Sequence, residues 1–460
     1  MISLAASKIA EIVEGKLYGE DISVTAAPVF NSAQATAGSI FLALKGPARD
    51  GHDFVSDAFA HGAVLALTTS QVSQRCIVVD DVTKALGMLA AFVRNELKNL
   101  KVIAITGSQG KTTTKDLLSH LLSSQGSTVA PQGNFNNEIG APLTILECTQ
   151  QTKFCIVEMG ARHIGDIAAL CQMAKPDIGV VLKVGRAHVG EFGSQEAIAK
   201  AKSEMISSLQ PTSLAILGGY DEFTPKMAAL HKGKTVVFGE KSSFEVRATD
   251  IEVREGRAHF DLVTPQGRAA VGLQVVGLHQ IANALAVAAI AEGLGFNLDL
   301  IAQSLSMAKI SSKWRMEIHE FDGKVLINDC YNASPESMEA ALRSLILFAQ
   351  ERGGEAWAFL GKMHELGESS ASDHARVGTL AQELGVDHLV CIGAPEYARD
   401  IVVKDEAAES MSIHYCADIE QAQSLSLIIN AGDVALIKAS RSEHLELLSD
   451  YILKHAGGEE

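Results

Sequence analysis

The chain has 460 residues, 47% of them hydrophobic and 20% charged, which is enough for about three domains with sizeable apolar cores. Its 39 Lys and Arg are outnumbered by 55 Asp and Glu. The formal net charge of −16 excludes nucleic acid as the main partner, because no basic stripe is present to neutralise phosphates.

The first 97 residues open with a short amphipathic helix and then alternate brief strands with loops. Two turn-rich pieces are prominent: residues 29–46, where a strand runs into a turn, and residues 50–62, where D-G-H-D-F leads into a helix. Glycines and small polar residues at strand ends can hold a nucleotide or a sugar. Ordinary turn chemistry explains the same residues as well, so both interpretations stay open.

Residues 101–115 are the stretch around which the chain is organised, because an apolar, β-branched strand passes through T-G-S-Q-G-K-T-T-T-K into a leucine-rich helix. Gly107 and Gly110 let the backbone approach a polyphosphate, and Lys111 adds a positive charge beside the free N–H groups of the helix N-terminus. Thr112 is placed to put its hydroxyl on a magnesium ion. The strict motif has a glycine where this chain has an isoleucine, so this is a variant phosphate-binding loop. A glycine-rich turn without a ligand is the alternative, but a lysine at a helix N-terminus is unfavourable without an anion.

From about residue 100 to 308 strands alternate with helices, which predicts a mostly parallel sheet with ligands at the carboxyl ends of its strands. Glu158 ends the strand F-C-I-V, where its carboxylate can bind magnesium or can instead cap the next helix. His188 follows the next strand, at residues 177–184. Three successive strands then carry polar groups to one edge, which favours a site over a structural histidine.

Later residues of this region are less specific. The helix at 194–205 carries Lys202, which the pattern alone assigns to a solvated face. Residues 235–276 alternate polar and apolar side chains and predict antiparallel hairpins added to the sheet. Asn283 opens an alanine-rich helix, where its amide can contact a purine base or cap a turn, and the pattern does not decide between these.

A third α/β unit begins beyond residue 310. Arg315 lies at the junction, where a domain that closes over a nucleotide can bring it to the phosphates. Polar and glycine residues again follow the strands. The strands are predicted at residues 324–327, 356–360, 388–392 and 433–437.

In order and spacing, nine motifs resemble those of the Mur ligases, the ATP-dependent amide-forming enzymes of peptidoglycan synthesis. The resemblance is strongest to the members that add D-alanyl-D-alanine to UDP-N-acetylmuramoyl-tripeptide, and the D-N-P-R signature of the diaminopimelate-adding members is absent. The motifs are D-G-H-D-F at 50–54, the phosphate loop, N-F-N-N-E-I-G at 134–140, V-E-M-G-A at 157–161, G-R-A-H-V-G-E-F-G-S at 185–194, A-K-S-E at 201–204, R-M-E at 315–317, Y-N-A-S-P-E-S at 331–337 and E-L-G-E at 365–368.

The resemblance implies an α/β fold with the three-domain Mur ligase architecture. Residues 1–98 would form the N-terminal domain that binds the UDP-sugar, residues 99–309 the central ATP-binding P-loop sheet, and residues 310–460 a Rossmann-like domain that closes on ATP and the amine. It implies ATP and Mg²⁺ as cofactors, and UDP-N-acetylmuramoyl-tripeptide and D-alanyl-D-alanine as substrates joined through an acyl phosphate. The product would be a cell-wall precursor.

The expected setting follows from composition. Seven scattered cysteines without a C-x-x-C pair indicate reduced core thiols in a cytoplasmic protein. We expect no signal peptide, because residues 1–15 carry charges at helical spacing and lack an apolar core. We also expect no membrane span, because the apolar helix at residues 284–291 is far too short. Small molecules are therefore the expected partners rather than a membrane or nucleic acid. Nothing demands an oligomer, so a monomer is expected.

The resemblance also implies roles for single residues. The catalytic residues would be Lys111, His188, Lys202 and Arg315. The metal ligands would be Thr112, Glu158, His188 and Lys202, the last carbamylated and so no longer a surface cation. Asn283 and Asn332 would lie near adenine, Asp329 near ribose and Arg315 near the transferred phosphate. The full ATP-binding set would be Thr106, Gly107, Ser108, Gln109, Gly110, Lys111, Thr112, Thr113, Asn283, Arg315, Asp329 and Asn332. The substrate contacts would be Ser32, Lys45, Gly46, Asp50, Gly51, His52, Asn134, Asn136, Asn137 and Ser440.

The chain departs from the family pattern at several substrate contacts. It has N-S-A at 31–33 for D-S-R, G-K-M at 361–363 for G-D-M, K-A-S-R at 438–441 for K-G-S-R, and Gln280 for asparagine. Two alternatives follow. One is a folylpolyglutamate-synthetase-like ligase, which the N-terminal region fits poorly. The other is a nucleotide-binding regulator that has lost catalysis, against which the retained lysines and carboxylate argue.

Overall fold

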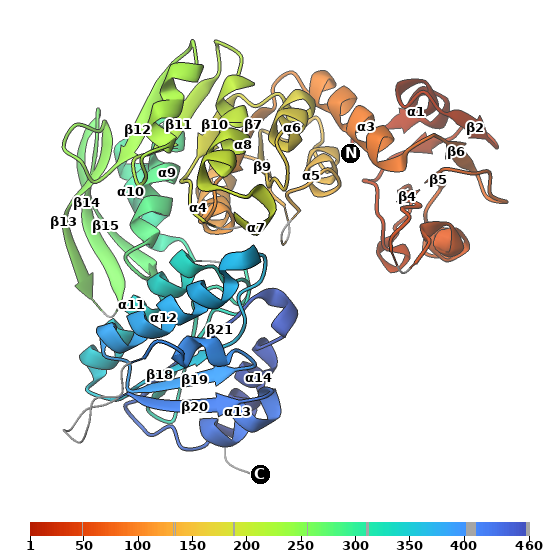
Figure 1. Cartoon of the computed structure of the whole chain (residues 1–460). Helices are drawn as coiled ribbons and strands as arrows, with labels where there is room; N and C mark the ends of the chain where they lie inside the picture. The colour runs from red at the N-terminus through yellow and green to blue at the C-terminus, as the bar shows by residue number, and fades with distance from the viewer. Residues whose placement is uncertain are drawn as a thin grey trace.

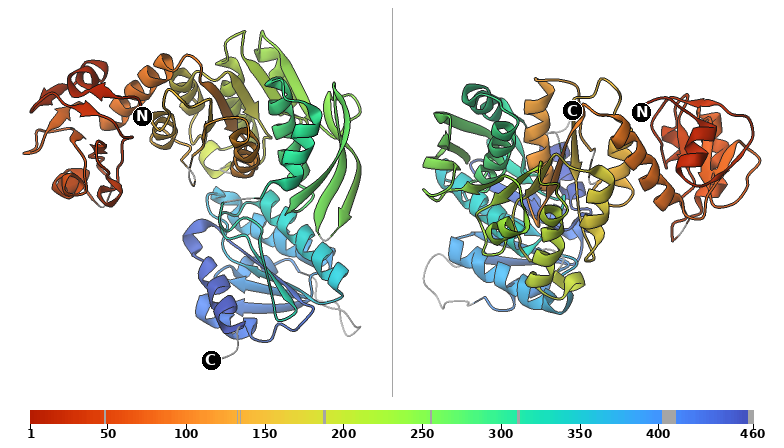
Figure 2. Two further views of the ribbon diagram at one scale, coloured as in Figure 1. Left: turned by 180° about the vertical axis from the view of Figure 1, so that it is seen from behind. Right: turned by 90° about the horizontal axis from the view of Figure 1, so that it is seen from above.

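The computed structural model describes residues 1–47, 49–131, 133, 135–186, 189–254, 256–309, 312–401 and 411–456. The described strands form sheets of two, four, nine and six strands. The nine-stranded sheet lies at the centre, the N-terminal part projects to one side of it, and the C-terminal part lies below it in the view of Figure 1. The other views of Figure 2 agree with this three-part arrangement, and the fold is α/β as expected.

The N-terminal part is a small sheet joined to the rest by a long helix. The four-stranded sheet has the order β2-β6-β5-β4, and β1 pairs with β3. The helix α3 (Val82–Glu96) begins where Asp81 accepts hydrogen bonds from the backbone N–H groups of Thr83 and Lys84. Its apolar face shares one core with the central part. The elements are β1 (Leu4–Ala5), α1 (Ala6–Ile12), β2 (Lys16–Tyr18), β3 (Ser23–Val24), β4 (Ile40–Leu42), α2 (Val55–Ala60), β5 (Leu65–Thr68) and β6 (Cys76–Val78).

The central sheet has the strand order β15-β14-β13-β12-β11-β10-β7-β9-β8. Strand β7 (Lys101–Thr106) lies between the parallel strands β9 and β10. Its alternate residues enter two separate cores, Val102 one and Ile103 the other, because helices cover both faces of the sheet.

The antiparallel pairs β13–β14 and β14–β15 confirm the hairpins that the sequence predicted. The strand predicted at 177–184 is shorter than expected, because β10 ends at Val181 before a loop. The remaining bounds are α4 (Lys111–Ser123), β8 (Thr128–Val129), α5 (Gly140–Leu146), β9 (Phe154–Glu158), α6 (Asp166–Ala174), β10 (Ile178–Val181), α7 (Val189–Phe192), α8 (Gln195–Ser207), β11 (Leu214–Gly218), β12 (Thr235–Gly239), β13 (Val246–Arg254), β14 (Arg257–Thr264), β15 (Gly267–Val276), α9 (Gln280–Gly293) and α10 (Leu298–Met307).

The C-terminal sheet has the order β16-β17-β21-β18-β19-β20, and among its described strands only β16 is antiparallel to its neighbour. The four predicted strands are confirmed, whereas β16 and β20 were missed because both are edge strands with half-buried, mixed sequences. The elements are β16 (Glu317–Phe321), β17 (Lys324–Asn328), α11 (Pro335–Arg352), β18 (Ala356–Leu360), α12 (Ser370–Leu384), β19 (His388–Ile392), β20 (Ser412–Cys416), α13 (Ile419–Ser426), β21 (Val434–Lys438) and α14 (Glu446–Ala456).

All seven cysteines are buried and free, which confirms the expectation of core thiols. Across the described ranges, no helix combines the length and the apolarity needed to cross a bilayer.

Candidate active site

A cleft of about 1320 Å³ opens where the three parts of the chain meet. Phe30 and Leu44 of the N-terminal part line one end of it. The phosphate loop (residues 106–112) contributes from the central part, and residues 329–334 and 440–444 from the C-terminal part. Because these loops follow the carboxyl ends of parallel strands, their polar groups collect at one place.

The phosphate loop owes its shape to Gly110, the N-cap residue of α4. Its φ of 83° lies in the left-handed region that side chains disfavour. A Cβ there would collide with Oδ1 of Asn283. The Lys111 Nζ donates a hydrogen bond to the Gly107 carbonyl oxygen at 2.7 Å, so the lysine folds back over the loop. The loop thus forms a cradle with a cation at its centre.

We expect Gly110→Ala to weaken ATP binding strongly and to lower stability by about 2 kcal/mol, because the left-handed backbone and the contact with Asn283 both oppose a Cβ. Calorimetric titration with ATP and thermal unfolding measure the two effects. The matched control is Gly87→Ala in α3, where an added Cβ meets nothing within 4 Å. Equal stability and ATP affinity in the two variants would contradict this account of the loop.

Glu158 ends β9 and is completely buried beside the loop. Its Oε2 accepts a hydrogen bond from the Thr112 hydroxyl at 3.4 Å, while Oε1 has no partner among the described residues. Burial raises the pKa of Glu158, and the charges of Lys111 and Arg315 oppose that rise. An unpartnered buried carboxylate oxygen beside a threonine hydroxyl fits a magnesium ion, which prefers oxygen ligands.

The alternative role for Glu158, as a cap of the next helix, is wrong. Helix α6 begins at Asp166, and Gly165 is its N-cap residue. The carboxylate that reaches this helix end is that of Glu204, which accepts hydrogen bonds from Gly165 N at 2.6 Å and from Ala168 N at 3.0 Å. The Glu158 side chain therefore does not cap this helix, and it lines the cleft.

Lys202 lies on α8 and lines the cleft, with only 6% of its surface exposed. The solvated face that the pattern suggested is therefore wrong for Lys202: Ile198 and Met205 share its buried side, whereas Lys200 is exposed. Its amine makes no hydrogen bond or ion pair with a described residue. Burial, and to a lesser degree the charge of Lys111, lower the pKa of Lys202 to about 7. A large fraction of this amine is neutral, and hence nucleophilic, at neutral pH.

Arg315 crosses from the C-terminal part to the phosphate loop. Its Nη2 donates a hydrogen bond to the Thr112 hydroxyl at 2.9 Å. The guanidinium lies over the Tyr331 ring, 3.9 Å from the ring centroid. Its Nε is buried and has no partner among the described residues, so the side chain retains a donor for an anion.

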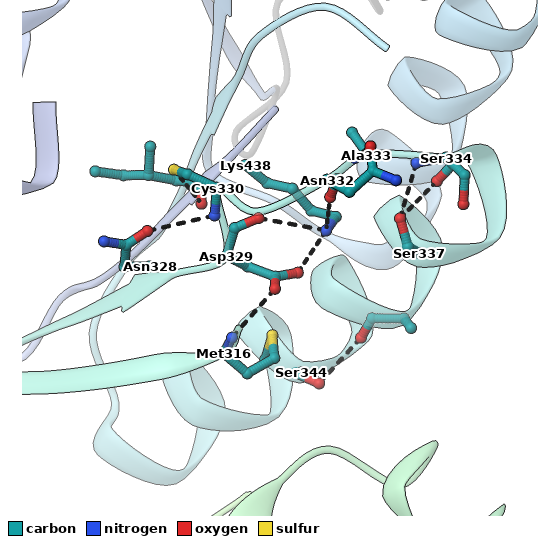
Figure 3. A network of polar contacts seen from close by, with 12 residues as sticks. Met316, Asn328, Asp329, Cys330, Asn332, Ala333, Ser334, Ser337, Ser344 and Lys438 are labelled. Atoms are coloured by element: carbon teal, nitrogen blue, oxygen red, sulfur yellow. Dashed lines mark hydrogen bonds and ion pairs between the residues drawn. The ribbon is translucent and has the colours of Figure 1, made fainter. Parts of the chain in front are cut away.

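The turn after β17 is held by a buried lysine, as Figure 3 shows. The Lys438 Nζ lies 2.5 Å from Oδ2 of Asp329 and donates to the Asn332 carbonyl oxygen at 2.8 Å. Oδ1 of Asp329 accepts from Met316 N at 3.1 Å, and Oδ1 of Asn332 accepts from Ala333 N at 2.9 Å. Sequence reasoning assigned no role to Lys438, although its place at the end of a buried strand was a usable signal.

Four other predicted contacts lie at or behind the cleft wall. Asn136 and Asn137 line it, and Ser440, which also lines it, accepts a hydrogen bond from His364 N at 2.9 Å. The Asn283 amide lies behind Gly110, where Oδ1 accepts from Thr114 at 3.3 Å and Nδ2 donates to Gln280 at 2.7 Å, so it braces two helices rather than capping a turn. Its predicted place near adenine stays a prediction.

Five of the predicted sugar-binding residues lie in one turn of the N-terminal part, outside the cleft wall, whereas Ser32 begins a separate 3₁₀ helix (Ser32–Gln34). Asp50 Oδ1 lies 2.6 Å from His52 Nδ1, and Lys45 pairs with Asp50 as an isolated β-bridge. Their partners in the prediction, Ser32, Gly46 and Gly51, do not line the cleft. The turn and sugar interpretations of this segment both remain. Asn134 and His188 lie outside the described residues.

Comparison with known proteins gives a consistent result. Residues 105–291 match the Mur ligase middle domain, and residues 314–441 match the Mur ligase glutamate ligase domain. The chain is 36% identical to the UDP-N-acetylmuramoyl-tripeptide–D-alanyl-D-alanine ligase of Mycobacterium tuberculosis, covering 98% of both chains. Among solved structures, MurF from Acinetobacter baumannii is 31% identical, with a TM-score of 0.88 over 98% of this chain and 99% of that one. MurF from Thermotoga maritima in complex with ADP is 30% identical, with a TM-score of 0.81 over 94% and 98%.

Proposed function

The chain belongs to the Mur ligase family, and from that premise we propose how its own residues carry out the reaction. It is an ATP-dependent ligase that joins D-alanyl-D-alanine to UDP-N-acetylmuramoyl-tripeptide. The name of its Mycobacterium tuberculosis relative gives the two substrates, and the ADP complex of Thermotoga maritima MurF supports the use of ATP. The observation that carries this assignment is the cleft, in which Lys111, Glu158, Lys202 and Arg315 meet at the phosphate loop. Neither the folylpolyglutamate-synthetase-like nor the regulator alternative is supported by a comparable observation.

The reaction begins between two anions. A carboxylate oxygen of the tripeptide attacks the γ-phosphorus of ATP, which yields an acyl phosphate and ADP. The amine of D-alanyl-D-alanine then attacks the acyl carbon, loses a proton and expels phosphate. Lys111 and Arg315 lower the barrier because they offset the repulsion between carboxylate and polyphosphate in a partly desolvated site.

Magnesium fits the remaining groups. Thr112 and Glu158 would hold it, a carbamylated Lys202 would add a carboxylate-like ligand, and His188 would bind a second magnesium ion. When bound, it supplies positive charge that neutralises the polyphosphate. Carbamylation joins the neutral Lys202 amine to carbon dioxide with loss of a proton, and it replaces a cation beside Lys111 with an anion. The lowered pKa of Lys202 favours this step, because only the neutral amine is a nucleophile.

The three parts divide the binding work. We propose that residues 1–98 bind the UDP-sugar, residues 99–309 bind ATP, and residues 310–460 close on ATP and the amine. Asp329, fixed by Lys438, supports a ribose contact, and Asn332 beside it supports a contact to adenine. The seven buried free cysteines support a reducing, cytoplasmic setting, and a monomer suffices because one chain supplies the whole cleft.

The test is phosphate release by the purified chain with magnesium-ATP, UDP-N-acetylmuramoyl-tripeptide and D-alanyl-D-alanine, each omitted in turn. We expect release to require all three and the product to have the mass of the UDP-linked pentapeptide. Running the series with tripeptides ending in diaminopimelate and in lysine identifies the substrate. ATP binding without release for either tripeptide would favour the regulator.

A further inference from the structure

Glu336 joins the C-terminal part to two loops of the ATP-binding part. It is the second residue of α11, and its carboxylate is half-buried. Oε1 accepts a hydrogen bond from Arg186 N at 2.7 Å, and Oε2 accepts from Gln109 Nε2 at 3.5 Å. The same Gln109 amide also donates to the Ser334 hydroxyl at 3.1 Å.

The two donors come from loops that are already bonded to each other. Gln109 belongs to the phosphate loop, and Arg186 belongs to the loop after β10. Ser108 connects these loops, because its hydroxyl accepts from Gly185 N at 2.8 Å and its backbone N–H donates to the Lys183 carbonyl oxygen at 2.9 Å. One carboxylate thus holds both loops at the point where they meet.

A second set of contacts holds the loop after β10 on its other side. The Arg186 guanidinium lies 3.6 Å from the buried carboxylate of Asp373 in α12. Further along, Gly190 packs so closely on Gly367 that a Cβ on Gly190 would lie 2.5 Å from Gly367 N. These contacts keep the C-terminal part docked against this loop.

The position of Glu336 also limits the electrostatic repulsion between its carboxylate and a bound polyphosphate. A carboxylate beside a polyphosphate site is repulsive by itself. Glu336 lies in the first turn of an 18-residue helix, where the helix dipole stabilises an anion. Its role therefore depends on the docked helix, and a free C-terminal part would leave Gln109 and the Arg186 N–H without this acceptor.

We propose that Glu336 is a positioning residue for ATP, which sets the shape of the phosphate loop when the C-terminal part docks. The proposal rests on the proposed function. Loss of the Glu336 contacts raises the KM for ATP and leaves the KM for the UDP-linked substrate unchanged, because the N-terminal part is not touched. A purely structural role lacks this selective effect on one substrate.

The test compares full-length variants for KM of each substrate, kcat and thermal midpoint. We expect Glu336→Ala to raise the KM for ATP about tenfold, because Gln109 and the Arg186 N–H both lose their charged acceptor. Glu336→Gln should raise it about threefold, because its amide oxygen still accepts one bond. The matched control is Glu339→Ala on the same helix, which loses only the ion pair to Arg343, 2.9 Å away, and should stay within about twofold.

A double variant shows whether Gln109 and Glu336 act through one shared interaction or whether each substitution acts independently. If Gln109 and Glu336 act together, Gln109→Ala combined with Glu336→Ala should raise the KM for ATP by less than the product of the single effects. Full multiplicativity, an unchanged KM for ATP in Glu336→Ala, or an equal rise for both substrates would overturn the proposal. Should the wild-type chain show no ligase activity, the proposed function fails instead, and calorimetric ATP affinities of the same variants decide the role of Glu336.

Discussion

Replacing Lys111 with alanine is expected to abolish turnover, with kcat falling by about 10³-fold or more. Lys111 lies at the N-terminus of α4, at the centre of the phosphate loop. Burial lowers its pKa, although the charge of Glu158 opposes that effect. In the proposed mechanism its ammonium offsets the negative charge of the γ-phosphoryl group. Initial rates of phosphate release under saturating substrates measure the loss.

The matched control is Lys101→Ala, at the first residue of β7, the strand that leads into the phosphate loop. Lys101 is exposed and lies 3.5 Å from a carboxylate oxygen of Asp177, so its removal should leave kcat within about twofold. Thermal midpoints of both variants show whether the fold is intact. Turnover by a folded Lys111→Ala protein at more than about a tenth of the wild-type rate would remove Lys111 from the mechanism.

Replacing Lys202 with alanine is expected to lower kcat by about 10²-fold or more, and a short carboxylate such as acetate should restore part of the activity. The substitution leaves space at a buried position, where a carboxylate can stand in for the carbamate that we propose on Lys202. Lys200→Ala is the matched control, because Lys200 lies on the same helix with its side chain exposed. Full activity in Lys202→Ala without added carboxylate would contradict the assignment. So would a loss that no small carboxylate restores.

The pH dependence of activity is a second test of the role of Lys202. The pKa of Lys202 is lowered from 10.5 to about 7, so the neutral, reactive amine predominates above that pH and is lost as the pH falls through it. Wild-type activity should therefore decrease on acidification through about pH 7, and added bicarbonate should oppose the decrease. The acetate-rescued Lys202→Ala protein lacks this amine, and its profile should not show that step.

Local patterns carried most of what the sequence could predict. The strand, glycine turn and helix at the phosphate loop lie within one continuous segment, so their order alone indicates the structure. The place of Glu158 follows from the same logic, because the end of a buried strand fixes where a side chain emerges. Arg315 was predicted to reach the phosphates from its place at a domain junction, and the structure puts its guanidinium on Thr112.

Long-range packing accounts for what the sequence could not predict. A lysine among alanines looks solvated. The helical spacing of Ile198, Lys202 and Met205 was the local signal that this side of α8 is buried, but it does not say which elements cover it. The contact of Glu336 with Arg186 joins residues 150 positions apart, so no local motif announces it. The N-terminal turn around Asp50 and His52 has a clear motif, yet these two side chains contact each other and do not line the cleft. Phe30 and Leu44 line it instead.

The most direct test of the account follows one oxygen atom. If the cleft activates the tripeptide by transferring the γ-phosphoryl group to its carboxylate, a tripeptide labelled with ¹⁸O in that carboxylate should pass one labelled oxygen to each phosphate released. Mass spectrometry of the phosphate, under conditions that require D-alanyl-D-alanine, measures the transfer. Unlabelled phosphate accompanied by pentapeptide product would contradict the acyl-phosphate mechanism and the role given to this cleft.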